Sequence, residues 1–428
     1  MTEAAEPSSD ARISGRAAAF RVATVVVVAA PAVSFRVTGT TLSPAAAMLV
    51  FGAGVLASVA LLMWAAEAAR ADISGSLALA LLSLVAILPE YAVDIFFAYS
   101  AGGRPEYGAY ATANMTGANR LLIGVAWPLL VFVAIWALRR RDRGSDSGEP
   151  AGWLSGGVAL AAHRRIELWF LAAATTYALL IPLTGRLAWY DSVVLGGLFG
   201  AYLWRIRGSA ESEEELTGVA AIVADQPRLR RRILVGALFA AAAVVILSAA
   251  EPFGDSLVET GSELGIDRFL LVQWLAPIAS ESPEVLVAIT FALRARADDG
   301  MGALLAAKLN QWTLLIACLP IAFYLGGGKA AGLALDSRQT EEFVLTTAQT
   351  VLGVAILANL RLTGAKALLL LGLFAAQFVL PDESARYVIS GVYVVVAAVY
   401  LIAQRRDVLP LLAAVRRPKA DEVTSRTA

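Results

Sequence analysis

The sequence predicts an all-α polytopic membrane protein with about twelve transmembrane helices, in two inverted-topology repeats of about five helices each plus flanking helices. Three observations predict this fold class. Hydrophobic residues make up 58% of the chain and charged residues only 16%, whereas a soluble protein is about a quarter charged. The apolar residues come in blocks of roughly twenty, the length that a helix needs to cross a bilayer. Two distant segments also share one sequence plan.

The predicted spans are continuous apolar runs, without the short alternating pattern of barrel strands. They cover approximately residues 20–36, 44–69, 75–101, 108–138, 165–184, 187–205, 233–262, 267–294, 300–325, 341–360, 363–381 and 386–403. The first span also fits an uncleaved anchor or a signal peptide. Arg36 directly after it, and the lack of a small-residue cleavage pattern, favour a retained helix.

Basic residues favour one orientation in the membrane, because cytoplasmic loops carry an excess of Lys and Arg. The cluster after the fourth span is therefore predicted to be cytoplasmic, and counting from it places the other clusters and both termini on the same side. These clusters contain Arg139, Arg140, Arg141 and Arg143; Arg228, Arg230, Arg231 and Arg232; Arg405, Arg406, Arg416, Arg417 and Lys419; and Arg12, Arg16 and Arg21. The expected location is the cell membrane.

The chain is expected to divide at its polar connections. The predicted parts are an N-terminal tail and extra helix (1–43), a first repeat (44–206), a cytoplasmic linker (207–231), a second repeat (232–381), and an extra helix with a cytoplasmic tail (382–428). The linker runs from acidic to basic without a long apolar stretch.

Composition excludes several kinds of chemistry. Cys318 is the only cysteine, so no disulfide can form within the chain, and His163 is the only histidine. Zinc, haem and iron–sulfur sites draw mostly on these two residue types, whereas hard cations bind to carboxylate, amide and carbonyl oxygens. We therefore expect no cofactor and no nucleic-acid partner; the expected partners are inorganic cations and the lipid bilayer. The sequence does not predict an oligomeric state.

The shared plan places a Pro-Glu pair in the middle of a predicted span in each half. The two segments are 81–102 with 110–130, and 271–295 with 303–323; the pairs are Pro89-Glu90 and Pro283-Glu284. Asn114 follows Glu90 at the same spacing as Lys308 follows Glu284. The span count makes the two helices run in opposite directions, which is the plan of many secondary transporters.

This pattern suits cation binding in the middle of a membrane. A proline inside a helix removes a backbone donor and frees a carbonyl oxygen near the glutamate. A carboxylate at the bilayer centre costs roughly 2.5–3.5 kcal/mol even on the lenient insertion scale, so buried carboxylates in apolar helices need a partner or a function. A purely structural alternative is a buried Glu90–Glu284 pair that braces two helices, with or without Lys308.

The pattern resembles the paired α-repeats of the sodium/calcium exchanger superfamily of cation antiporters. That family has a Pro-Glu in the second helix of each half, followed by a helix carrying Gly-Asn-x-x-Gly-Ser-Asn. Residues 113–119 follow this pattern, with Ala for its Gly and Ser. The resemblance covers roughly 44–381 and implies that Glu90 and Glu284 are the central cation ligands, supported by Asn114 and Asn119. It implies antiport of Ca²⁺, or a similar cation, against Na⁺ or H⁺ by alternating access, and no enzymatic activity.

The chain departs from the family at the residues that precede each Pro-Glu. The family has Gly-Thr-Ser-x-Pro-Glu, whose hydroxyls help hold sodium. Here the corresponding residues are Val85, Ala86 and Ile87 in the first half, and Ala279, Ser280 and Glu281 in the second. Most of the hydroxyls are missing and Glu281 adds a carboxylate, one helical turn before Glu284.

Further polar residues join the candidate site. Asp94 lies one turn beyond Glu90, and Asn310 and Gln311 supply either ligand oxygens or helix–helix hydrogen bonds. Lys308 stands where the family has Asn or Asp. Its ammonium is expected to occupy a cation subsite by pairing with Glu281 or Glu284, which favours proton over sodium coupling.

Other interpretations stay open. Lys308 fits equally well as a snorkelling or salt-bridging lysine. The chain fits a lysine-modified relative that carries another substrate, including an anion, and a non-transporting membrane scaffold or sensor that keeps the fold. Six tryptophans are predicted to anchor the helices at the membrane interfaces: Trp127, Trp136, Trp153, Trp169, Trp189 and Trp204.

Overall fold

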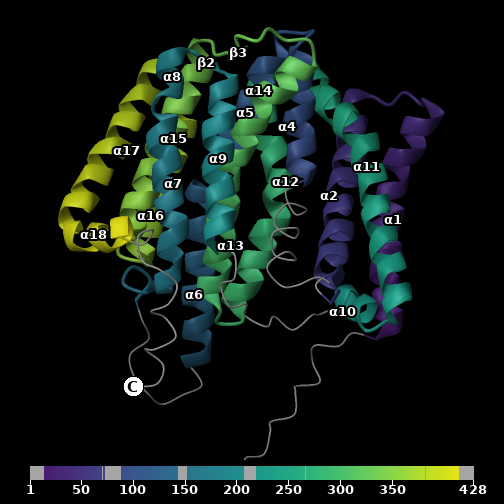
Figure 1. Cartoon of the computed structure of the whole chain (residues 1–428), viewed down its shortest axis with the longest axis horizontal. Helices are drawn as coiled ribbons and strands as arrows, with labels where there is room; N and C mark the ends of the chain where they lie inside the picture. The colour runs from purple at the N-terminus through teal and green to yellow at the C-terminus, as the bar shows by residue number, and fades with distance from the viewer. Residues whose placement is uncertain are drawn as a thin grey trace, which may run out of the picture. The chain divides into compact units, whose positions relative to one another are not determined.

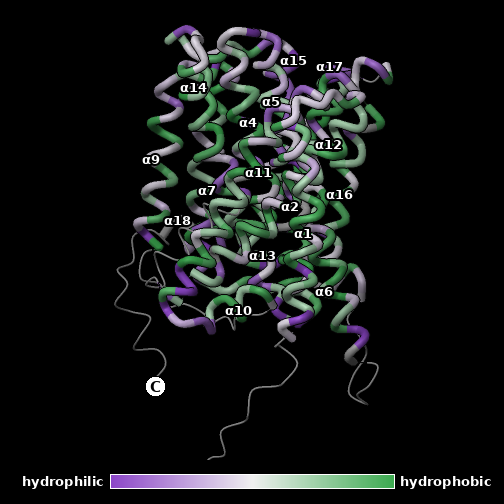
Figure 2. Tube along the Cα trace, turned by 90° about the vertical axis from the view of Figure 1, so that its right-hand side faces the viewer, coloured by the Kyte–Doolittle hydropathy of each residue, from purple (hydrophilic) through white to green (hydrophobic). Residues whose placement is uncertain are grey.

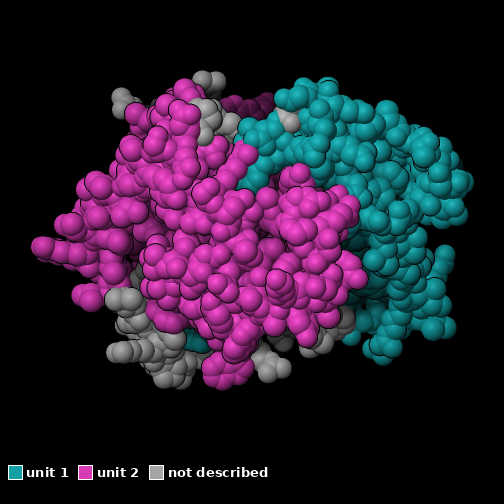
Figure 3. Space-filling model, turned by 90° about the horizontal axis from the view of Figure 1, so that it is seen from above, with its two compact units in different colours: residues 1–96, 205–271 teal, residues 97–204, 272–428 magenta. Residues whose placement is uncertain are grey.

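The computed structural model of the chain is almost entirely helical (Figure 1). The structure describes residues 14–69, 71–72, 88–142, 152–206, 218–265, 267–380 and 382–413. Val85, Ala86 and Ile87, and much of the predicted linker (207–217), lie outside these residues. Contacts divide the chain into two compact units, which are described separately: unit 1 contains residues 1–96 and 205–271, and unit 2 contains residues 97–204 and 272–428 (Figure 3).

The helices agree closely with the predicted spans. The α-helices are α1 (Gly15–Thr38), α2 (Pro44–Ala69), α4 (Leu88–Ala101), α5 (Tyr107–Leu121), α6 (Trp127–Asp142), α7 (Arg165–Ala178), α8 (Ile181–Thr184), α9 (Trp189–Ile206), α10 (Gly218–Ala224), α11 (Arg228–Glu263), α12 (Arg268–Leu293), α13 (Ala297–Asn310), α14 (Ile316–Leu325), α15 (Ser337–Leu357), α16 (Gly364–Val379), α17 (Glu383–Ala403) and α18 (Arg405–Ala413). The predicted linker contains α10 and the start of α11.

Several helices are long and apolar enough to cross a membrane. Among the described residues, 7 helical segments meet this criterion, and three shorter apolar helices accompany them. The 7 are Gly15–Thr38, Pro44–Ala69, Tyr107–Arg140, Ala162–Thr184, Arg228–Glu263, Ala297–Leu325 and Glu383–Ala403. Hydrophobic residues predominate along the middle of the helices, and hydrophilic residues gather toward helix ends such as that of α6 (Figure 2). The predicted fold class is confirmed.

Helix α5 and helix α13 share an unusual continuation. A five-residue π-helix, Leu122–Ala126, joins α5 to α6, and a second one, Gln311–Leu315, joins α13 to α14. π-Helical stretches inside α-helices are rare and occur frequently at functional sites. Both follow the polar residues that the sequence plan aligns, so the two halves share this irregularity as well as their motif.

Unit 1 is built by close packing of α1, α2 and α11. Gly54 lets these helices approach closely, because a Cβ atom there would lie 2.7 Å from the Cβ of Ala32 and 3.6 Å from that of Ala249. Small residues at such contacts are typical of membrane helix pairs. Leu61 and Leu62 of α2 pack with Ile246 of α11 in a buried apolar cluster, so the first helices of the two predicted repeats form one packed group.

Unit 2 contains α5 to α9, α13 to α18, and most of α12. Two short antiparallel ribbons tie its loops together: β1 (Gly157–Ala159) pairs with β4 (Arg361–Thr363), and β2 (Arg186–Leu187) pairs with β3 (Leu333–Ala334). Helix caps fix the starts of two helices, because Asp336 accepts a hydrogen bond from the Gln339 backbone at α15, and Thr363 accepts one from the Lys366 backbone at α16.

The predicted interface tryptophans differ in exposure, and Trp169 is half-buried. Trp136 and Trp153 are each 45% exposed, and Trp189 and Trp204 are more exposed still, as an interface anchor requires. Trp127 is fully buried. The prediction is therefore wrong for Trp127, whose ring fills space beside Gly353 inside unit 2.

Candidate functional site

The structure divides the predicted site residues between the two units. Unit 1 contains Glu90 and Asp94, while unit 2 contains Asn114, Asn119, Glu281, Glu284, Lys308 and Asn310. Glu90 and Asp94 lie one turn apart on α4 and are 3% and 0% exposed. Both acidic side chains are therefore buried in an apolar helix. The pairing of Glu90 with Glu284 remains a prediction.

Within unit 2, the structure brings Lys308 and Asn119 together. The Nζ of Lys308 donates a hydrogen bond of 2.6 Å to Oδ1 of Asn119, and lies 3.5 Å from the Asn119 backbone oxygen. Asn119 Nδ2 in turn donates to the Met115 carbonyl oxygen at 2.8 Å. These two bonds fix the orientation of the amide, so that its oxygen faces the ammonium.

The surroundings of Lys308 correct two expectations. The residue is 0% exposed, so it does not snorkel to the membrane surface. Among the described residues, no ion pair joins Lys308 to Glu281 or Glu284; the ammonium contacts Asn119 and lies 4.4 Å from the centroid of the Trp312 ring. The side chain of Gln311 donates to Oε1 of Glu281 at 2.6 Å, while Lys308 donates to Asn119.

Helix α12 carries the two glutamates of the second half. Glu281 is 4% exposed, and Glu284 is partly buried, with an Oε2 atom that has no hydrogen-bond partner among the described residues. Asn310 and Asn114 are also buried. In the described part of the chain, no group of three or more His, Cys, Asp and Glu residues is arranged to hold a metal ion. A cation here would therefore take amide as well as carboxylate oxygens.

Gly117 allows α5 to approach α12. A Cβ atom at Gly117 would lie only 1.8 Å from the backbone oxygen of Gln273. The side chain of Gln273 is itself fully buried, and neither its Oε1 nor its Nε2 has a partner among the described residues. Sequence reasoning did not select Gln273, although a glutamine inside an apolar span is a detectable signal.

A second polar cluster was also not predicted. Arg120, directly after Asn119, is fully buried and lies 2.5 Å from Glu342 Oε2 of α15. It donates to Oε1 of Gln377 on α16 at 3.1 Å, and Arg386 of α17 pairs with Glu342. Two arginines and a glutamate thus link four helices. Arg120, Glu342 and Arg386 lie inside predicted spans, and charged residues at such positions could have indicated a buried ion-pair network.

The fold and these residues define the class of protein: a polytopic helical membrane protein with buried carboxylates and amides on helices of two matching halves, as secondary transporters have. The chain matches the model of the sodium/calcium exchanger protein family over residues 33–207 and 234–381. It therefore belongs to the sodium/calcium exchanger family.

Solved structures agree with this assignment. The crystal structure of the H⁺/Ca²⁺ exchanger CAX is similar, with a TM-score of 0.85 and 38% sequence identity over 94% of this chain and 98% of that chain. The Ca²⁺/H⁺ antiporter protein YfkE shares the fold, with a TM-score of 0.56 and 15% identity over 87% of this chain and 99% of that chain. No match was found among curated proteins.

Proposed function

We propose that this protein is a secondary antiporter that moves Ca²⁺ across the membrane in exchange for H⁺. The observation that carries this proposal is the set of buried carboxyl groups, Glu90 and Asp94 on α4 and Glu281 on α12, in apolar helices. Such groups are costly in a bilayer unless they serve ion binding. The 38% identity with the H⁺/Ca²⁺ exchanger CAX supports the choice of ions.

In this proposal, Glu90 and Glu284 bind the cation and Asn114 and Asn119 support them. The carboxyl groups give up protons when Ca²⁺ binds and take up protons when it leaves, so that the same oxygens carry the two ions in turn. Asp94, Glu281 and Asn310 modulate the charge around them. An ion gradient drives the cycle.

Lys308 favours protons over sodium as the coupling ion. Its ammonium already lies against the carbonyl-type oxygens of Asn119, which are the kind of ligand that Na⁺ takes. The lysine amine fills the place beside these oxygens that a second cation would take. We therefore expect little sodium-driven transport by the natural sequence.

Alternating access is proposed to involve unit 1. The first helices of the two repeats, α2 and α11, pack tightly there through Gly54, Ala249 and the Leu61–Leu62 cluster. This packing supports their movement as one body, as rocking-bundle transporters require. We further propose that the protein lies in the cytoplasmic membrane, with the Arg139–Arg140 end of α6 and both termini in the cytoplasm.

Uptake of ⁴⁵Ca²⁺ into proteoliposomes tests the proposal. Uptake is measured under an imposed pH gradient and separately under a sodium gradient, for the natural protein and for Glu90→Gln and Glu284→Gln. The matched control is Glu251→Gln, which changes a glutamate that is about half exposed on α11 and paired with Arg36. We expect pH-driven uptake that both site variants abolish and the control retains. Absence of gradient-dependent calcium flux would contradict the calcium assignment.

The same assay separates cation from anion transport. With a cation site, Lys308→Asn keeps calcium uptake or gains dependence on sodium, because the fixed charge is gone while an amide oxygen remains. With a site that attracts an anion to the ammonium, Lys308→Asn abolishes transport of that anion.

A further inference from the structure

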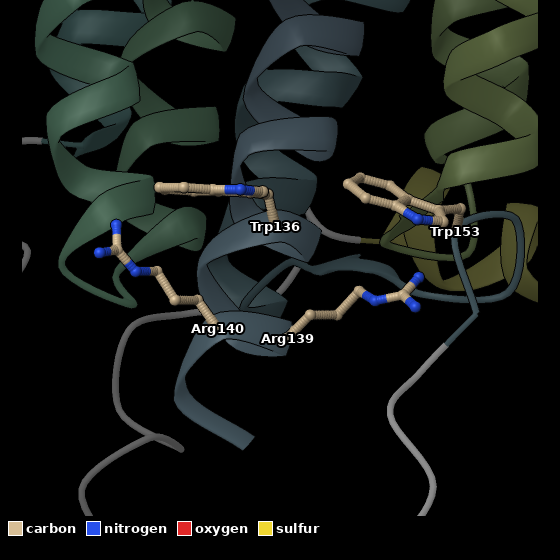
Figure 4. A pocket seen from close by; sticks show the side chains of 4 residues that line it. All are labelled: Trp136, Arg139, Arg140 and Trp153. Carbon is tan, nitrogen blue, oxygen red and sulfur yellow. The ribbon is translucent and has the colours of Figure 1, made fainter. Parts of the chain in front are cut away.

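A basic and aromatic site lies at the end of α6, away from the residues discussed above. Trp136, Arg139, Arg140 and Trp153 line a cavity of about 280 Å³ in unit 2 (Figure 4). The first three residues belong to the last turns of α6, and Trp153 belongs to the loop that precedes β1. The site is thus formed by a helix end and a loop of the same unit.

Each arginine of this site is stacked on a tryptophan. The Arg139 guanidinium carbon lies 5.1 Å from the centroid of the Trp153 ring, and that of Arg140 lies 5.4 Å from the centroid of Trp136. The two guanidinium groups point to opposite sides of α6 in Figure 4. Within the described part of the chain, neither arginine has an ion pair, and each has an aromatic ring as its neighbour.

The loop that carries Trp153 is held firmly on α16. Ala365 N donates to the Leu154 oxygen at 3.0 Å, and Gly364 N donates to the Gly156 oxygen at 2.8 Å. The Trp153 backbone oxygen lies so close to Gly364 that a Cβ there would be 1.8 Å away. This anchoring fixes the Trp153 ring beside Arg139 and favours a preorganised site.

An apolar groove adjoins the Arg139–Trp153 pair. It has a volume of about 480 Å³ and is lined by Leu154, Ala365, Leu368, Leu369, Gly372 and Leu373. Leu154 directly follows Trp153, so consecutive residues form walls of the basic cavity and of the groove. A Cβ atom at Gly372 would meet nothing within 4 Å, which leaves the groove open at that point.

We propose that this composite site binds an anionic phospholipid. The headgroup phosphate lies against the Arg139 guanidinium beside the Trp153 ring, and one acyl chain lies in the groove along α16. A basic pocket at a helix end in the membrane interface is suited to anionic headgroups, and arginine is suited to phosphate. The adjoining apolar groove is suited to an acyl chain, which favours a lipid over a soluble phosphate as the occupant.

Native mass spectrometry of the full chain tests the headgroup part of the site. Binding is measured with phosphatidylglycerol and with zwitterionic phosphatidylcholine. We expect Arg139→Gln to weaken phosphatidylglycerol binding about fivefold, the effect of one basic residue near a membrane surface, and to leave phosphatidylcholine binding unchanged. The control is Arg186→Gln, an exposed arginine of β2, which should change neither. Equal loss with both arginine variants, or no preference for the anionic lipid, would overturn the proposal.

A glycine pair tests the acyl part. Gly372→Phe places a ring in the groove and should weaken lipid binding, whereas Gly391→Phe, at an equally open glycine of α17, should not. Inorganic phosphate forms the third arm of the experiment. If millimolar phosphate displaces the lipid completely, or if Gly372→Phe has no effect, the site is a phosphate site and the lipid assignment is wrong.

Discussion

Lys308 Nζ lies 2.6 Å from Asn119 Oδ1. This hydrogen bond joins α13 of the second predicted repeat to α5 of the first. The amide oxygen accepts from the ammonium while the amide nitrogen is already used by the Met115 carbonyl. The lysine has thus taken one of the oxygens that the family resemblance assigned to a transported cation. The bond has consequences for stability as well as for ion coupling.

The first prediction concerns the stability of this pair. Asn119→Leu removes the amide oxygen and leaves the buried Lys308 amine with the long contact to the backbone oxygen of residue 119 and the Trp312 ring. We expect a loss of roughly 3 kcal/mol, because a buried polar group that loses its main hydrogen bond is costly. Thermal unfolding of the detergent-purified protein measures the change. The double variant Asn119→Leu/Lys308→Met removes the charge and should recover part of the loss. If the single and double variants are destabilised equally, the loss of stability does not come from the Lys308–Asn119 hydrogen bond.

The second prediction concerns the contact between α5 and α12. Gly117→Ala introduces a Cβ 1.8 Å from the Gln273 backbone oxygen, which forces the helices apart and should cost about 3 kcal/mol. The matched control is Gly200→Ala on α9, where a Cβ meets nothing within 4 Å. That change should be neutral, or stabilising by up to about 1 kcal/mol, since alanine favours helix. Both are measured as shifts in the midpoint of thermal unfolding.

Hydropathy predicted the helices well but could not predict their partners. The second span was predicted at 44–69, and α2 covers Pro44–Ala69, because an apolar run ends where the bilayer does. The partner of Lys308 was predicted to be a glutamate and is Asn119. A lysine near two glutamates in the sequence suggests an ion pair, but the oxygen that lies within reach of the lysine depends on how α5 and α13 pack.

The unpredicted features share one physical cause. Arg120 and Glu342 are 222 positions apart in the chain, and no local pattern relates them. Likewise, the π-helices at Leu122–Ala126 and Gln311–Leu315 have no propensity signal, since they depend on contacts with neighbouring helices. The contacts of these charges depend on tertiary packing between helices, which a single sequence does not reveal.

The third prediction concerns the Arg120–Glu342–Arg386 network. Glu342→Leu leaves two buried guanidinium groups without their shared carboxylate, and we expect a loss of roughly 3–5 kcal/mol. Glu106→Gln is the control, because Glu106 is exposed and its side chain makes no capping bond. Thermal unfolding gives the comparison. A variant as stable as the control would mean that the remaining partners suffice: Gln377 and the Trp274 ring for Arg120, and Glu341, 3.3 Å from Arg386.

The last prediction concerns the ion pair that closes unit 1. Asp72, just after α2, accepts two hydrogen bonds from Arg231 of α11, at 2.8 and 2.6 Å, and Arg231 also donates to the Ala224 oxygen at the end of α10. These hydrogen bonds from Arg231, with the nearby charge of Arg232, lower the pKa of Asp72 from 3.8 to about 2. The Arg231 guanidinium therefore connects α11 with the end of α10 and with the turn after α2.

Because the folded-state pKa of Asp72 is depressed, its stabilising effect is fully present above about pH 4 and is lost as the pH falls through about 2. Asp72→Asn should therefore lower the midpoint of thermal unfolding at pH 7, and its difference from the natural protein should shrink between pH 4 and pH 2. Asp225→Asn, an exposed aspartate of unit 1, is the matched control and should show no such pH-dependent difference. A deficit that stays constant down to pH 2 would mean that Asp72 acts through packing rather than through its charge.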